Sequence, residues 1–274
     1  LKELDRAAPG DIVVLSGIED AAIGDTICTV EEPKALPRIR VDEPTVSMRI
    51  TANDSPLAGT EGVYVQSNRI LERLQKEALR NVSIRLEVPA DNDGFILKGR
   101  GELQLAIIIE TMRREGFELC VSRPEVITLY RGSELLEPIE HLYIDCDEEY
   151  QGIVTATLSA RKGRMVNFIG MAGGRVRIEF EIPSRALIGY RGEVLTDTKG
   201  SGVMSSYLLG FEPYRGDFPA RRTGSIVADR RGTAVAYALF NLEPRGRLFI
   251  TSGEAVYEGM IIGEHSKEND IDVN

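Results

Sequence analysis

The stretch that decides the fold runs from Lys98 to Ile127 and reads KGRGELQLAIIIETMRREGFELCVSRPEVI. Between Leu105 and Met112 the apolar residues recur at helical spacing, and Gly116 supplies a C-terminal stop. Apolar and polar residues then alternate from Phe117 to Val121, which is typical of a strand. The stretch therefore predicts a helix followed by a strand, opened by Gly-Arg-Gly.

The opening glycines allow two interpretations, a phosphate-binding loop or a tight turn from strand to helix. A dinucleotide-binding fingerprint needs a third glycine, and position 104 is glutamine. A Walker loop occurs nowhere in the sequence. Glu102 would lie in the first turn of the helix, where a carboxylate suits the helix dipole and repels a phosphate. We therefore interpret the glycines as a structural turn.

The sequence around this stretch predicts two α/β units of the same kind. The first has the order β-α-β-β-α-β, which is the split βαβ of ferredoxin-like domains. The second repeats this order with little sequence identity. The predicted elements of the first are 46–50, 67–80, 84–88, 95–98, 105–112 and 117–121, and those of the second are 138–146, 148–161, 164–170, 175–182, 184–196 and 203–209.

The predicted fold class is α+β, with four units. Residues 1–37 are the end of a β-barrel and a linker, with a strand at Ile12–Leu15. Residues 38–131 and 132–210 are the two ferredoxin-like domains. Residues 211–274 form a small all-β domain, with Ala234–Leu239 as one of its strands. Its polar tail offers no closing strand, which leaves a flexible or a truncated end as the two interpretations.

Composition excludes several classes of protein. No apolar run approaches the roughly 18 residues that cross a bilayer, and no signal peptide is present. The first residue is not methionine, so we expect a fragment. The odd, dispersed set Cys28, Cys120 and Cys146 predicts neither a disulfide framework nor a zinc site, which favours a reducing cytoplasm. His141 and His265 are too isolated for a metal site or a catalytic triad.

Charge is unevenly distributed. The net charge is −10, yet residues 153–247 contain 15 Lys and Arg against 8 Asp and Glu. Basic residues on turns and helix ends contact phosphates with little sequence readout. The candidate RNA-binding residues are Arg161, Lys162, Arg164, Arg191, Lys199, Arg221, Arg222, Arg230 and Arg231.

Several motifs resemble those of the elongation-factor-G class of translational GTPases. GRGELQL at 99–105 resembles the third domain of that class, and EEYQG at 148–152 with RKGR at 161–164 resembles the fifth. IPSRALIGYR at 182–191 and YALFNL at 237–242 narrow the resemblance to the BipA/TypA GTPases. The resemblance covers essentially the whole chain.

This resemblance implies a region that docks on ribosomal RNA and A-site tRNA and couples docking to GTP hydrolysis in an N-terminal domain absent here. The implied partners are the ribosome, tRNA and the chain's own GTPase domain, in a cytoplasmic monomer. Stress adaptation, subunit assembly (ribosome biogenesis) and elongation all stay open as the process that it serves. The fragment itself is expected to have no catalytic residues, cofactor or metal, because GTP and magnesium belong to the N-terminal domain.

Two alternatives remain open. Tandem βαββαβ units also form ACT-like domains, which bind amino acids at paired interfaces; that reading predicts a ligand pocket. An acylphosphatase-like enzyme would need an arginine and an asparagine converging on one loop, and the sequence offers no clear pair.

Overall fold

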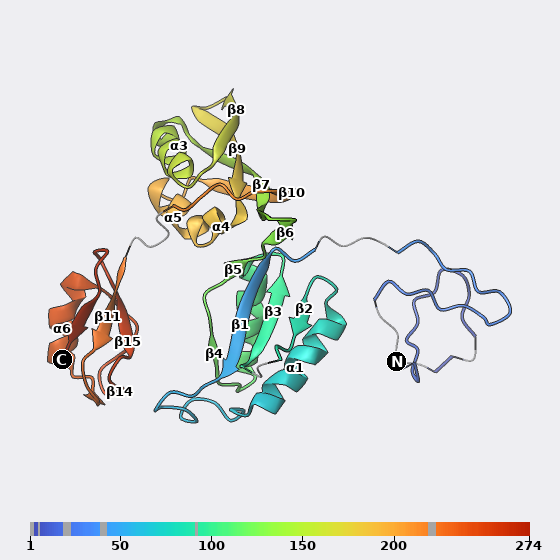
Figure 1. Cartoon of the computed structure of the whole chain (residues 1–274), viewed down its shortest axis with the longest axis horizontal. Helices are drawn as coiled ribbons and strands as arrows, with labels where there is room; N and C mark the ends of the chain where they lie inside the picture. The colour runs from blue at the N-terminus through green and yellow to red at the C-terminus, as the bar shows by residue number, and fades with distance from the viewer. Residues whose placement is uncertain (1–2, 5, 19–22, 39–42, 91–92, 219–222) are drawn as a thin grey trace.

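The computed structural model describes residues 3–4, 6–18, 23–38, 43–90, 93–218 and 223–274, which include two α/β domains and a smaller third domain (Figure 1). The predicted barrel strand at Ile12–Leu15 is not found, since residues 6–18 and 23–38 contain turns but no strand. Ile12 and Val30 are almost fully exposed. A barrel strand is held by neighbouring strands, and the described residues offer this segment none. No described helix is long and apolar enough to cross a membrane.

The first domain is ferredoxin-like, as the sequence predicts. Its main strands form an antiparallel sheet in the order β2-β3-β1-β4, with two helices on one face. The short strand β5 (Glu125–Val126) also pairs with β1. The elements are β1 (Val46–Ala52), α1 (Ser67–Arg80), β2 (Arg85–Glu87), β3 (Phe95–Gly99), α2 (Glu102–Arg114) and β4 (Leu119–Val121).

The Gly-Arg-Gly turn is structural. Gly101 is the N-cap residue of α2, and the helix buries Leu105, Ile108 and Met112, as the spacing predicts. A Cβ on Gly99 would lie 3.0 Å from the Leu105 side chain, so the glycine allows the strand to pack closely on the helix. Each buried apolar side chain stabilises the domain by roughly 1.5–3 kcal/mol.

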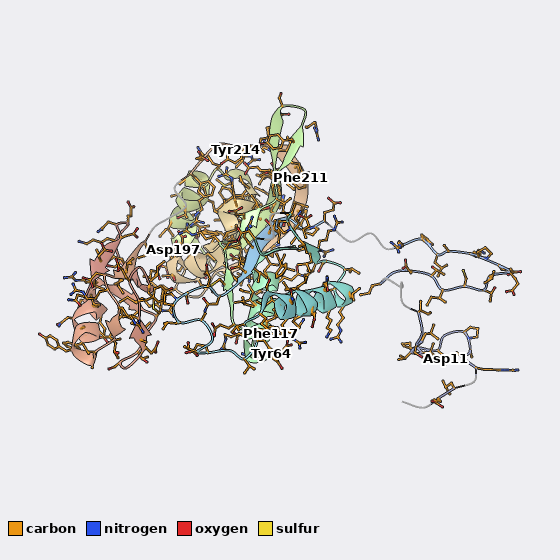
Figure 2. The ribbon with its side chains drawn as sticks, turned by 60° about the horizontal axis from the view of Figure 1, so that its bottom comes forward. Asp11, Tyr64, Phe117, Asp197, Phe211 and Tyr214 are labelled. Carbon is orange, nitrogen blue, oxygen red and sulfur yellow. The ribbon has the colours of Figure 1, made fainter. Side chains whose placement is uncertain are left out.

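Glu118 fixes the loop that joins β1 to α1. Its buried carboxylate accepts hydrogen bonds at 2.7–3.1 Å from the Asn53 side chain and the backbone N–H groups of Gly59, Glu61 and Gly62. These donors, led by the Gly59 and Gly62 N–H groups, hold the pKa of Glu118 at about 2. The loop ends where the Tyr64 ring packs against Phe117, with centroids 4.9 Å apart (Figure 2).

The second domain has the same topology, with strand order β10-β7-β9-β8. Its last strand runs to Pro213, three residues past the boundary expected at 210. The hairpin strand β6 (Leu129–Arg131) extends the sheet beside β7. The elements are β7 (Glu134–Asp147), α3 (Gln151–Ala160), β8 (Arg164–Met171), β9 (Arg175–Pro183), α4 (Ser184–Leu187), α5 (Tyr190–Asp197) and β10 (Val203–Pro213).

The single short helix expected at 184–196 is two helices, because Gly189 interrupts it with a left-handed φ of 73°. A Cβ on Gly189 would meet nothing within 4 Å, so only backbone conformation opposes a side chain. We predict that Gly189→Ala lowers the unfolding free energy by about 1–2 kcal/mol. Gly192→Ala, inside α5 with equally open space, should instead raise it by up to about 1 kcal/mol. Urea unfolding of both variants measures the difference, and equal effects would contradict the argument.

The segment that follows β10 is anchored to the second domain by a buried ion pair. Glu137 is fully buried, and its carboxylate accepts hydrogen bonds from Arg185 Nε at 2.5 Å and from the Arg215 backbone N–H at 2.7 Å. The Arg185 guanidinium lies over the rings of Tyr214 and Phe218, 4.3 and 4.7 Å from their centroids. These contacts fix residues 214–218, which lead into the third domain.

The third domain is not all-β. Residues 236–242 form helix α6, where the sequence predicts a strand over 234–239. Leu239 and Leu242 lie three residues apart and pack on the core. This spacing places both side chains on one face of a helix, so the segment buries its apolar residues as a helix and not as a strand. The tail also supplies a strand: β16 pairs in parallel with β11 and borders the sheet β13-β15-β11-β16. The strands are β11 (Gly224–Ala228), β12 (Gly232–Thr233), β13 (Gly246–Leu248), β14 (Ala255–Val256), β15 (Ile261–His265) and β16 (Ile271–Val273).

Candidate nucleic-acid interface

Helix α3 ends in a tight turn that presents Lys162. The Lys162 N–H donates to the carbonyl of Ser159 at 3.1 Å, and the Gly163 N–H donates to that of Leu158 at 2.9 Å. This pair of bonds is the Schellman pattern, in which the first residue beyond the cap adopts a left-handed conformation. Lys162 occupies that position with φ 67°.

Helix α5 ends in the same way and presents Lys199. The Lys199 N–H donates to Thr196 at 3.1 Å, and the Gly200 N–H donates to Leu195 at 2.7 Å. Lys199 has φ 49°. Among the residues that the structure describes, these two lysines are the non-glycine residues with positive φ. Glycine is the usual residue at this position, and another residue there costs about 1–2 kcal/mol.

The two lysines lie at opposite ends of α3. Lys162 follows its last turn, whereas Lys199 lies 5.7 Å from the ring of Tyr150, which precedes its first turn. A helix of 10 residues is about 15 Å long. The predicted cations of this domain therefore form two separate groups, and a partner must contact both ends to use both.

Arg161 and Arg164 differ in how far their side chains are free to contact RNA. The Arg161 side chain is 15% exposed: it donates to the Ala186 carbonyl at 2.7 Å, pairs with Glu193 and lies over the Tyr190 ring. It thus clamps α3 to α5, an interaction that the sequence prediction missed. Arg164 pairs with Glu181 but stays 69% exposed.

Arg191 lies outside both groups. It lines a pocket between the two ferredoxin-like domains. The same junction is bridged by Glu102, whose carboxylate oxygens accept hydrogen bonds from the Gly189 N–H at 3.0 and 3.2 Å. The glutamate that begins α2 therefore serves an interdomain contact.

The predicted arginines of the third domain are only partly described. Arg230 forms a bidentate ion pair with its neighbour Asp229, at 2.9 and 2.7 Å. This arginine lowers the pKa of Asp229. Arg231 is exposed on the same turn, and Arg221 and Arg222 lie outside the described residues.

Sequence reasoning also missed the open face of the second sheet. His141, Tyr143 and Tyr207 stack there, with ring centroids 4.6–6.2 Å apart. The alternation Arg175, Arg177, Glu179, Glu181 along β9 is the signal that could have revealed this charged face. Its arginines are matched by acids, so it carries no excess of positive charge.

The acidic run at 145–149 is engaged by an arginine of the neighbouring strand β9. Asp145 accepts two hydrogen bonds from Arg177, both 2.7 Å, and this contact lowers its pKa. Asp147 precedes the first helical turn but makes no side-chain capping bond there. The described part of the chain holds no cluster of His, Cys, Asp and Glu suited to a metal.

Two protein families match consecutive parts of the chain. Residues 134–222 match the elongation factor G C-terminus, and residues 223–274 match the TypA/BipA C-terminal domain. The first match ends where the second begins, within the segment that joins the second and third domains.

Whole-chain relatives agree with these matches. The large ribosomal subunit assembly factor BipA of Escherichia coli K12 is 46% identical over 273 residues, which cover 99% of this chain and 45% of that protein. The BipA proteins of Bacillus subtilis and Haemophilus influenzae are 45% and 46% identical over the same length. The chain spans less than half the length of these relatives. With both family matches, this identity shows that the chain belongs to the BipA/TypA family of elongation-factor-G-like proteins and represents its C-terminal region.

Proposed function

We propose that this chain is the ribosome-binding region of a translational GTPase and that it binds RNA through the ends of α3 and α5. The observation that carries the proposal is the lysine at both helix ends, in a position where glycine is favoured. A lysine held there at a conformational cost points to a role for its side chain. The relatives are named assembly factors of the large ribosomal subunit, so we take that subunit as the partner.

The binding mode follows from the side chains. Lys162, Lys199 and Arg164 reach solvent and can contact phosphate oxygens. Such contacts release counterions, so affinity should fall steeply as salt rises. Arg231, with Arg221, Arg222 and Arg230, forms a second proposed contact in the third domain, directed at A-site tRNA. Arg161 does not contact RNA in this proposal; it positions Lys162 and Lys199 by holding α3 against α5.

The coupling step is assigned to the whole protein. We infer that docking of these domains signals to an N-terminal domain that binds GTP and magnesium and performs the hydrolysis. The bridge between Glu102 and Gly189 supports this, because it joins the two ferredoxin-like domains. We assign the whole protein to the cytoplasm, as a monomer.

Co-sedimentation with purified large ribosomal subunits across a potassium chloride series tests the proposal. Changing Lys162, Arg164 and Lys199 to glutamate should abolish binding at low salt. A control with Arg69, Arg113 and Arg114 changed to glutamate alters net charge equally on exposed parts of the first domain and should still bind. Equal binding by both variants would contradict the proposed interface. Changing the four third-domain arginines tests the second contact in the same way.

Glycine substitution separates side-chain function from helix termination. Lys162→Gly with Lys199→Gly relieves the left-handed strain, so the unfolding free energy should stay unchanged or rise by up to about 1 kcal/mol. Affinity for the subunit should fall roughly tenfold, because hydrogen bonds to charged groups are lost. Chemical unfolding and co-sedimentation on the same samples give both quantities. Unchanged affinity would mean that the lysines only terminate helices.

A further inference from the structure

A pocket of about 520 Å3 lies between the two ferredoxin-like domains. Small-molecule sites have volumes of roughly 300–1,000 Å3 and occur preferentially at domain interfaces. Apolar side chains from both domains line much of it: Val46, Met48, Leu103 and Ala106 from the first, and Leu187, Ile188 and Met204 from the second.

Ser184 lines this pocket and carries a buried hydroxyl without a partner in the described part of the chain. The residue is 3% exposed, and its Oγ has no partner in the part of the chain that the structure describes. Burying a hydroxyl without a partner costs about 1–3 kcal/mol. The buried hydroxyl of Thr198 shows the usual arrangement, since it donates to the Val194 carbonyl and accepts from the Gly202 N–H. The wall of the pocket at Ser184 therefore holds a buried polar group that the described part of the protein leaves unsatisfied.

The pocket also carries one charge of each sign that the protein does not pair. Arg191 and Glu140 both line it, and neither forms an ion pair with a described residue. Glu102, which lines it as well, is already occupied by the Gly189 N–H. A free cation and a free anion beside an apolar wall match a ligand that is itself zwitterionic.

We propose that this pocket binds a small zwitterionic molecule with an apolar body, of the size of a dipeptide with aliphatic side chains. Its carboxylate pairs with Arg191, and its ammonium group pairs with Glu140. The aliphatic side chains pack against the apolar wall. Because both domains contribute, the bound ligand stabilises their relative orientation. This site is independent of the proposed RNA interface.

Isothermal titration calorimetry with leucyl-leucine tests the proposal on the chain as it exists. The wild type should bind saturably. Arg191→Ala and Glu140→Gln should each weaken binding about tenfold or more. Arg80→Ala is the matched control, since this exposed arginine lies on α1, away from the pocket, and should leave binding unchanged.

A blocked probe tests the charge requirement. N-acetyl-leucyl-leucine amide has the same aliphatic side chains without either terminal charge, and it should bind at least about tenfold more weakly. Circular dichroism of each variant checks that it is folded. Absence of saturable binding to the wild type, equal affinity for the two probes, or unchanged binding by both charge variants would each overturn the proposal.

Discussion

Replacing Glu137 with alanine should destabilise the second domain by about 3–5 kcal/mol, because it leaves the Arg185 guanidinium buried without its counter-ion. The Arg185 side chain is 16% exposed and that of Glu137 is fully buried, so little water reaches the pair to replace the lost partner. The Arg215 N–H loses its acceptor as well. Hydrogen exchange of the β7 and β9 amides measures the effect within this domain alone.

Glu134→Ala is the matched control, since Glu134 lies on the same strand and is exposed. A surface substitution of this kind changes stability by about 0.5 kcal/mol or less. The same experiment reports on the linker, because residues 214–218 are anchored by the ion pair and should lose protection together with β7. If Glu137→Ala behaved like Glu134→Ala, the ion pair would not anchor the segment.

Replacing Glu118 with glutamine should lower stability at neutral pH by about 2–3 kcal/mol and remove part of its pH dependence. The pKa of this carboxyl is about 2 in the folded protein, against about 4.3 in an unfolded chain. A lowered pKa contributes stability that is present above pH 4.3 and is lost as pH falls toward 2. The expected loss of stability is smaller than the full difference in pKa would give, because the loop lies near solvent and water screens the charge.

Urea unfolding at several pH values between neutrality and about 2 checks this prediction. The wild type should lose more stability over that range than Glu118→Gln, and the two should converge near pH 2. Glu61→Gln is a control, because the Glu61 side chain is exposed on the same loop. Parallel pH profiles for the wild type and Glu118→Gln would contradict the assigned role.

The ferredoxin-like domains were predictable because their apolar spacing changes clearly between helix and strand. Leu105, Ile108 and Met112 are buried as their spacing predicts. The secondary structure of the third domain was harder to predict. Residues 234–242 are almost all apolar, so their spacing fits a helix and a strand equally well. Helix α6 and strand β16 depend on packing against the rest of that domain, which no local pattern specifies.

The sequence identifies the candidate basic residues, but not the contacts that each of them makes in the fold. Arg161 pairs with Glu193, 32 residues away, so its sequestration is a tertiary effect. Lys162 and Lys199 carried a readable signal, because each is followed by glycine just after a predicted helix. That signal predicts helix termination, and only the backbone shows that the lysine takes the left-handed position.

A cryo-electron microscopy structure of this chain bound to the large ribosomal subunit tests the central claim most directly. We predict that Lys162 or Lys199, together with Arg164, lies about 2.7–3.2 Å from phosphate oxygens of ribosomal RNA. Both ends of α3 facing solvent or ribosomal protein, in a complex held by other parts of the chain, would contradict it.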